Sequence, residues 1–165
     1  MNIAMPKITA QDAGENLHFG GGLITFKITS EQSGGVLCMF EHTSSYGKVT
    51  PLHLHLDEDE TGYILEGEFL FHIDGNEHRA GPGSVVWIPR GTAHAFMVVS
   101  ELARSIWVVT PGEVMESFYR QAGDAVMDRS LPSVEIDIPR IVAAGESTGA
   151  MKTLGPPPFS VNKSV

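Results

Sequence analysis

Two stretches of the chain, residues 47–67 (GKVTPLHLHLDEDETGYILEG) and residues 83–94 (GSVVWIPRGTAH), decide its fold. In the first stretch one residue separates His53 from His55, and four residues stand between His55 and Glu60. Glycine and proline bound both stretches or interrupt them, as is typical of sharp turns between short strands. The pattern predicts a compact β-structure whose polar side chains gather at one place.

Three histidines and a glutamate form the candidate site. His53 and His55 leave the same face of a strand, because side chains alternate along it. Glu60 returns to that face after an acidic loop, and His94 joins from the second stretch. Three imidazoles and a carboxylate suit one divalent Fe, Mn, Co, Ni, Cu or Zn ion. A closed structural zinc site more often uses cysteine, and the chain has only Cys38, which lies in an apolar run and is expected to be buried.

The rest of the chain predicts an all-β fold with one or two short C-terminal helices. Turn residues separate eight short β-rich runs, which favour an antiparallel sandwich or barrel. These runs are Leu23–Ile28, Gly35–Glu41, Pro51–His55, Gly62–Leu65, Glu68–Ile73, Ser84–Ile88, His94–Val99 and Ala103–Thr110. Val114 and Phe118 have helical spacing within Glu113–Ala122. Ile136–Ala144 forms a second helix if Pro139 lies in its first turn.

The expected organisation is a single domain, since 165 residues leave little room for a second. Residues 1–18 are expected to be an arm laid over the domain or a neighbouring subunit. Residues 19–112 form the barrel, and residues 113–165 form the helical segment and an extended tail. The acidic residues 57–59 are expected to be solvated.

Charge and segment composition limit the classes of function. A net charge of −9 argues against a general binder of nucleic acid or anionic membranes. The N-terminus lacks the features of a signal peptide, and no apolar stretch has membrane-spanning length. We therefore expect a cytoplasmic protein. A symmetric homodimer is the expected assembly, because it is the commonest closed oligomer.

The two stretches resemble the paired motifs of the cupin superfamily, and the resemblance covers most of residues 35–110. It implies a jelly-roll β-barrel with a metal ion in its mouth, held by His53, His55, Glu60 and His94. Residues 81–96, residues 110–113 with Phe118, and residues 154–157 are further similar to small one-cupin proteins related to quercetin (flavonol) dioxygenases.

Two positions depart from the cupin pattern. The second motif commonly ends in asparagine, where this chain has Val98. The residue two after the glutamate is usually aromatic, and here it is Gly62. Gly62 shares the face of Glu60, so the missing ring leaves either space beside the metal ion or a local bulge. We expect Gly62, Phe96 and Val98 to line the substrate pocket.

Other aromatic and histidine side chains are assigned from strand parity. Trp87, Met97 and Trp107 are expected in the core, and Tyr63 is expected to pack on the face opposite to Glu60. His42 and His72 lie at strand ends, where one residue of register decides whether they face the pocket. His18 and His78 are expected to be solvated.

Three functional hypotheses remain open, because one fold hosts many activities. The first is a dioxygenase acting on a phenolic, enolic or polyketide-like small molecule, with Glu60 as metal ligand and general base. The second is a non-oxidative isomerase, cyclase or lyase that uses the same metal as a Lewis acid. The third is a small-molecule-binding protein without turnover. Small molecules, with dioxygen in the first case, are the expected partners.

Overall fold

The computed structural model describes residues 6–132 and 135–159, and they form two antiparallel β-sheets with three helices. The larger sheet has the strand order β11-β1-β2-β3-β10-β5-β8. Its strands are β11 (Asp124–Val126), β1 (Glu15–Phe19), β2 (Gly22–Ile28), β3 (Cys38–Ser45), β10 (Leu102–Thr110), β5 (Asp59–Glu66) and β8 (Val85–Ile88). The smaller sheet has the order β12-β4-β9-β6-β7. Its strands are β12 (Lys152–Gly155), β4 (Leu52–Leu54), β9 (His94–Val98), β6 (Phe69–Ile73) and β7 (Asn76–Ala80). The all-β jelly-roll prediction is confirmed.

Alternation along the strands places the core between the sheets. On β10, Ala103, Ser105, Trp107 and Val109 are buried while their neighbours are partly exposed. Ala103, Trp107 and Val109 are apolar, and burial of such side chains is the main stabilising contribution to the barrel. Trp107 therefore lies in the core as expected.

The outer face of β5 and β8 corrects one assignment. Trp87 is 65% exposed and Val85, also on β8, is equally exposed, so Trp87 is not a core residue. Side chains alternate between the two faces of a strand, and Val86 and Ile88 occupy the inward positions of β8, so Trp87 points outward. Tyr63 faces outward as expected, but it is 46% exposed and therefore only partly packed.

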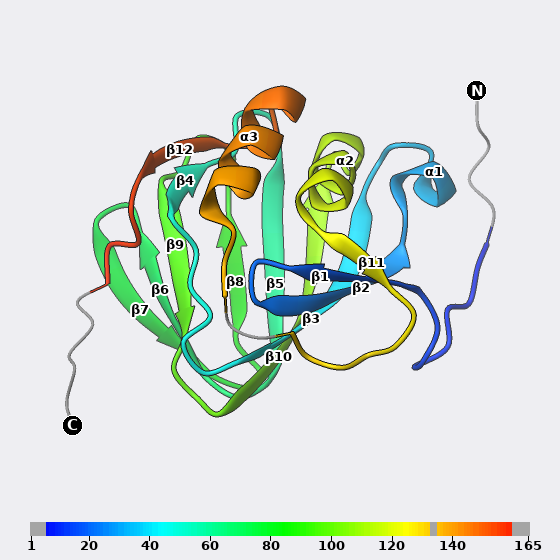
Figure 1. Cartoon of the computed structure of the whole chain (residues 1–165), viewed down its shortest axis with the longest axis horizontal. Coiled ribbons are helices and arrows are strands. Elements are labelled where there is room, and N and C mark those ends of the chain that lie inside the picture. Colours follow the sequence, from blue (N-terminus) through cyan, green and yellow to red (C-terminus); the bar gives the residue numbers. More distant parts are fainter. Residues whose placement is uncertain (1–5, 133–134, 160–165) are drawn as a thin grey trace.

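Helix α2 (Glu113–Ala122) has the bounds that its spacing predicts, although its buried face is rotated. Met115, Phe118 and Tyr119 are buried, whereas Val114 is 37% exposed. Helix α3 (Ile138–Thr148) begins with the Asp137 carboxylate accepting from the Arg140 amide, and its proline lies in the first turn. Figure 1 shows α2 and α3 next to each other at one end of the barrel. A short helix, α1 (Ser30–Ser33), has no counterpart among the expected elements.

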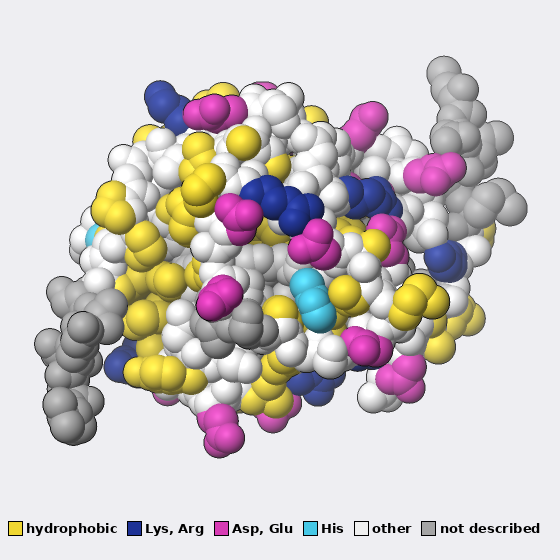
Figure 2. Space-filling view, in the orientation of Figure 1, with side chains coloured by type: hydrophobic (Ala, Val, Ile, Leu, Met, Phe, Trp, Pro, Cys, Tyr) yellow, Lys and Arg dark blue, Asp and Glu magenta, His cyan; other side chains and the backbone are white. Residues whose placement is uncertain are grey.

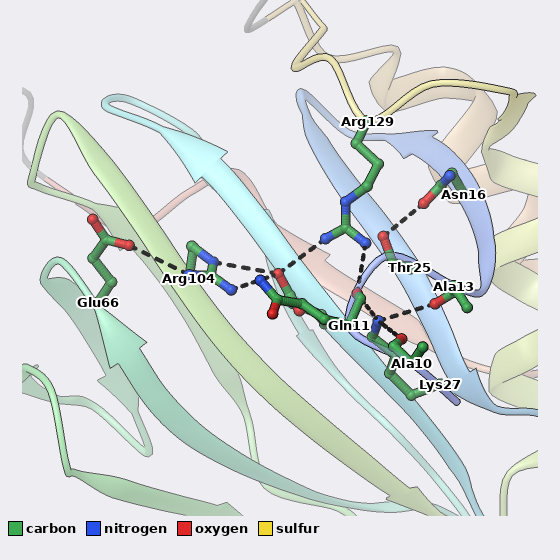
Figure 3. Close-up of polar contacts among 10 residues, drawn as sticks. Ala10, Gln11, Ala13, Asn16, Thr25, Lys27, Glu66, Arg104 and Arg129 are labelled. Atoms are coloured by element: carbon green, nitrogen blue, oxygen red, sulfur yellow. Dashed lines mark hydrogen bonds and ion pairs between the residues drawn. The ribbon is translucent and has the colours of Figure 1, made fainter. Parts of the chain in front are cut away.

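The N-terminal segment is laid over the chain's own larger sheet (Figure 3). The Lys27 ammonium on β2 donates to the carbonyl oxygens of Gln11 and Ala13 at 2.7 and 3.0 Å. The Arg129 and Arg104 guanidinium groups both donate to Glu41 Oε1, at 3.2 and 3.1 Å. These contacts join the arm, the loop after β11 and the sheet.

The sheets extend past the expected boundaries at residues 18 and 112. Residues 15–18 belong to β1, which pairs with β2 inside the larger sheet, and are not part of an irregular arm. Strands β11 and β12 also join the sheets from the region assigned to helices and tail. The proposed arm 1–18 and tail lie in part at residues 1–5 and 160–165, outside the described residues.

The surface is consistent with the charge distribution of the sequence. Figure 2 shows acidic and basic side chains interspersed on the face that it presents. Among the described residues, no helix has both the length and the apolar character needed to cross a membrane.

Candidate metal centre

Three strands bring the four predicted ligands together inside the barrel. His53 on β4 is the direct partner of His94 on β9, and their ring centroids lie 4.3 Å apart. His55 follows β4, and Glu60 lies on β5. All four side chains are buried. One nitrogen from each of the three imidazoles lies within 4.8 Å of the others, which is close enough to hold one ion.

Backbone carbonyls orient each imidazole in the same way. The Nδ1 atoms of His53, His55 and His94 lie 2.8, 2.6 and 2.9 Å from the carbonyl oxygens of residues 51, 150 and 92. A carbonyl only accepts, so each Nδ1 carries the proton and each Nε2 keeps a free lone pair. Metal-binding histidines typically use their second nitrogen in this manner.

The Nε2 atoms and the Glu60 carboxylate face one another. Glu60 Oε1 lies 3.6 Å from His55 Nε2, and Oε2 lies 3.4 Å from His94 Nε2. His55 Nε2 is buried and has no hydrogen-bond partner among the described residues. A buried nitrogen without a partner is unfavourable unless a ligand occupies the site. The donor set therefore fits a divalent transition metal ion.

The protonation states agree with this interpretation. Burial, reinforced by the charges of His94 and His55, lowers the pKa of His53 to about 3. Burial opposes ionisation of Glu60, but the neighbouring imidazoles, His55 first, outweigh it and lower the pKa of Glu60 to about 2. At neutral pH the site thus offers a neutral His53 imidazole and a carboxylate.

An ion pair connects the two sequence motifs beside the site. Arg90 donates to both carboxylate oxygens of Asp59, through Nε at 3.0 Å and through a terminal nitrogen at 2.8 Å. The Gly91 amide donates to the His55 carbonyl at 2.7 Å. These contacts fix the turn before His94 against β5, so the motifs converge.

The acidic loop is less solvated than expected. Asp59 is paired with Arg90, and Glu58 is only 3% exposed. Burial raises the pKa of Glu58, whose Oε2 has no partner among the described residues. Of residues 57–59, only Asp57 is exposed.

A cavity of about 70 Å³ adjoins the four predicted ligands. Its walls include Phe71, Phe96 and Trp107. Ile141 of α3 and Met151 before β12 close it from the C-terminal side. The cavity is well below the roughly 300–1,000 Å³ of drug-sized ligand sites, so it suits a small molecule.

Only some of the residues predicted to line the pocket do so. Phe96 lines the cavity as expected. Val98 is fully buried in the core and is not part of the cavity wall. Gly62 shares the inward face with Glu60, but neither alternative proposed for it holds. The register of β5 with β10 shifts at Arg104/Ser105 and not at Gly62, and there is no open space. A Cβ atom at Gly62 would lie 2.8 Å from Cη2 of Trp107, whose ring fills that volume.

Three further polar side chains lie in the cavity wall. His42 lines the cavity and shares a hydrogen bond of 2.7 Å with Ser44, while His72 is not part of the wall. Lys48 and Tyr119 also line it, and sequence reasoning missed both. Tyr119 lies four residues after Met115 on α2, so the helical spacing offered a signal for it. Lys48 offered no such signal, because lysine is usually solvated.

Comparisons with known proteins agree with the fold and the motifs. A family model described as Cupin domain matches residues 41–118. The chain is 27% identical to quercetin 2,3-dioxygenase of Bacillus subtilis over 121 residues. These residues are 73% of this chain and 36% of that protein, so the chain spans about a third of the relative's length.

Solved structures share the architecture at lower identity. A predicted oxalate decarboxylase from Thermotoga maritima superposes with a TM-score of 0.56 at 21% identity, over 65% of this chain and 99% of that one. An RmlC-like cupin from Shewanella frigidimarina gives 0.55 at 17% identity, over 67% and 96%. At these identities the likeness supports the fold alone.

Proposed function

Because the chain belongs to the cupin superfamily, we propose that it is a metal-dependent dioxygenase acting on a small enolic or phenolic molecule. The observation that carries this proposal is the convergence of three imidazole Nε2 atoms whose Nδ1 atoms are all held by backbone carbonyls. The similarity to quercetin 2,3-dioxygenase supports the oxidative reaction.

In the proposed mechanism, Glu60 acts as the general base. His53, His55, Glu60 and His94 would hold a divalent metal ion, which would supply a Lewis acid for a hydroxyl group of the substrate. Glu60, which is ionised and buried, accepts the proton of that hydroxyl through one carboxylate oxygen.

The cavity wall has a separate part in this mechanism. The rings of Phe71, Phe96 and Trp107 exclude water from the resulting anion, which then reacts with dioxygen. The size of the cavity favours an enolic substrate smaller than a three-ring flavonol.

Metal analysis combined with an oxygen-electrode screen tests the proposal. We expect about one transition metal ion per chain and oxygen uptake with small diketones or enols, weaker or absent with flavonols. The His94→Ala variant should lose both properties. Turnover without oxygen uptake would replace the proposal by a non-oxidative isomerase, cyclase or lyase. Tight binding without any turnover would indicate a binding protein.

A further inference from the structure

The Lys48 side chain is buried in the wall of the candidate metal pocket. The residue is 2% exposed and forms part of the wall that also includes His53, Glu60 and His94. Its ammonium nitrogen stands 5.3 Å from the ring centroid of Phe19 and 5.9 Å from that of Phe96. A charged group so placed is unfavourable unless it is paired.

The protein itself provides little compensation for this charge. The Lys48 ammonium donates to the carbonyl oxygen of Gly20, which is its one hydrogen-bond acceptor among the described residues. No carboxylate of the described residues lies within 4.0 Å of the nitrogen. The two aromatic rings attract a cation only weakly. Two of the three ammonium protons are therefore available to a ligand.

The backbone holds Lys48 in this position. The Val98 amide on β9 donates to the Lys48 carbonyl at 2.8 Å, and the Lys48 amide donates to Ser45 at 3.2 Å. Gly20, with φ of +52°, lies in the turn between β1 and β2. A Cβ atom there would lie 2.6 Å from the Lys48 nitrogen, so glycine leaves the room that the ammonium occupies.

We propose that Lys48 binds an anionic oxygen of the substrate, most simply a carboxylate, while the rest of the substrate faces the histidines and Glu60. This inference rests on the proposed function and narrows its substrate class to small enolisable acids. A divalent ion with one carboxylate ligand leaves one positive charge, and Lys48 adds a second. The carboxylate of the substrate offsets one of these two charges within a site of low polarity, where opposite charges attract most strongly.

The titration of Lys48 is consistent with this role. Burial lowers the pKa of Lys48 to about 7, so its charge is only partly retained at neutral pH. A bound anion favours the charged form and strengthens the ion pair. A purely structural lysine, holding the β1–β2 turn through Gly20, would not discriminate between charged and uncharged ligands.

Calorimetric titration of the metal-loaded protein with matched ligands tests the inference. The probes are acetoacetate with acetoacetamide, and 4-oxopentanoate with 4-oxopentanamide, which differ within each pair mainly in charge. Titration at about pH 6.5 keeps most of Lys48 protonated. We expect at least one acid to bind about 10- to 100-fold more tightly than its amide, the range for hydrogen bonds to charged groups.

Variants at position 48 should remove this preference. Lys48→Met deletes the charge, and Lys48→Gln retains a donor for the Gly20 carbonyl. In both variants acid and amide should bind within about threefold of each other. The matched control is Lys152→Met on the exposed face of β12, which should keep the wild-type preference. Melting temperatures no lower than that of the wild type would show that the variants fold.

Two results would overturn the inference: no preference for the acids in the wild-type protein, or a preference that persists in both Lys48 variants. Repeating the titrations on chelator-treated protein separates the two proposals. Metal-dependent binding of acid and amide alike, unchanged in Lys48→Met, rejects the role of Lys48 and leaves the proposed function standing. A Lys48-dependent preference that persists without metal supports the anion site independently of the metal chemistry.

Discussion

The indole ring of Trp107 occupies the space beside Gly62, its direct partner across β10 and β5. Many cupins place an aromatic residue at the position of Gly62. In this chain the neighbouring strand supplies the ring instead, so the inward volume next to Glu60 remains filled. Glycine at position 62 therefore leaves no open space beside Glu60.

This exchange predicts the effect of a small substitution. Gly62→Ala should destabilise the protein by ~1–3 kcal/mol, because its Cβ would overlap the indole ring. Urea unfolding measures the change. The control Gly81→Ala, where no atom lies within 4 Å of the added Cβ, should change stability by less than about 0.5 kcal/mol. The double variant with Trp107→Phe should recover part of the loss, and strictly additive effects would contradict the packing argument.

Removal of one imidazole should remove the metal. His53→Ala and His94→Ala each delete one of four predicted ligands, so elemental analysis should find little metal after dialysis. The melting temperature should also fall, because a ligand that binds the folded state stabilises it. His78→Ala on the exposed strand β7 serves as the control. Wild-type metal content in either ligand variant would reject the assignment.

The two proposed roles of Glu60 can be separated. Glu60→Gln keeps an oxygen ligand but loses the basic carboxylate. We expect metal to be retained and turnover to fall by about 10²–10⁴-fold, the range for general acid–base catalysis. Steady-state rates measured together with metal content check this. Unchanged turnover with metal present would show that another group accepts the proton.

His42 should make the protein less stable in acid. Burial, with the charge of Lys48, lowers the pKa of His42 from 6.5 to about 3. Between these values the unfolded chain binds a proton that the folded protein does not, so stability falls as pH decreases through this window. For chelator-treated protein, the loss between pH 7 and 5 should exceed that of His42→Gln by on the order of 2 kcal/mol. Equal losses in the two proteins would argue against a buried neutral His42.

Assembly as a homodimer remains a prediction. Light scattering coupled to size-exclusion chromatography should give twice the mass of one chain over a wide concentration range. A monomer at the highest concentration would refute it.

The sequence predicted well that His53, His55, Glu60 and His94 come together, because their spacings fix both strand face and turn geometry. The sequence was less informative where a residue type is compatible with both a strand and a loop, or with both faces of a strand. The sequence of strand β7 resembles that of a polar loop, because four of its five residues are polar and face solvent. Trp87 could be placed outward only from the burial of its neighbours, which depends on the strand register.

The pocket beyond the metal ligands was largely unpredictable. The space at Gly62 depends on Trp107, which lies 45 residues away in the chain and contacts it only through sheet pairing. The burial of Lys48 likewise depends on tertiary contacts with Gly20, Phe19 and Phe96. Neither relationship leaves a local pattern in the sequence.

The hydrogen bond between His55 and the carbonyl of Ala150 has a consequence for the order of events during synthesis. The two residues are 95 positions apart, so the ribosome must translate most of the chain after His55 before its orienting carbonyl exists. A nascent chain that already contains His53, Glu60 and His94 still has an unoriented third imidazole. The candidate metal site is therefore complete only after residue 150 has been synthesised, and we expect tight metal binding to follow synthesis of the whole barrel.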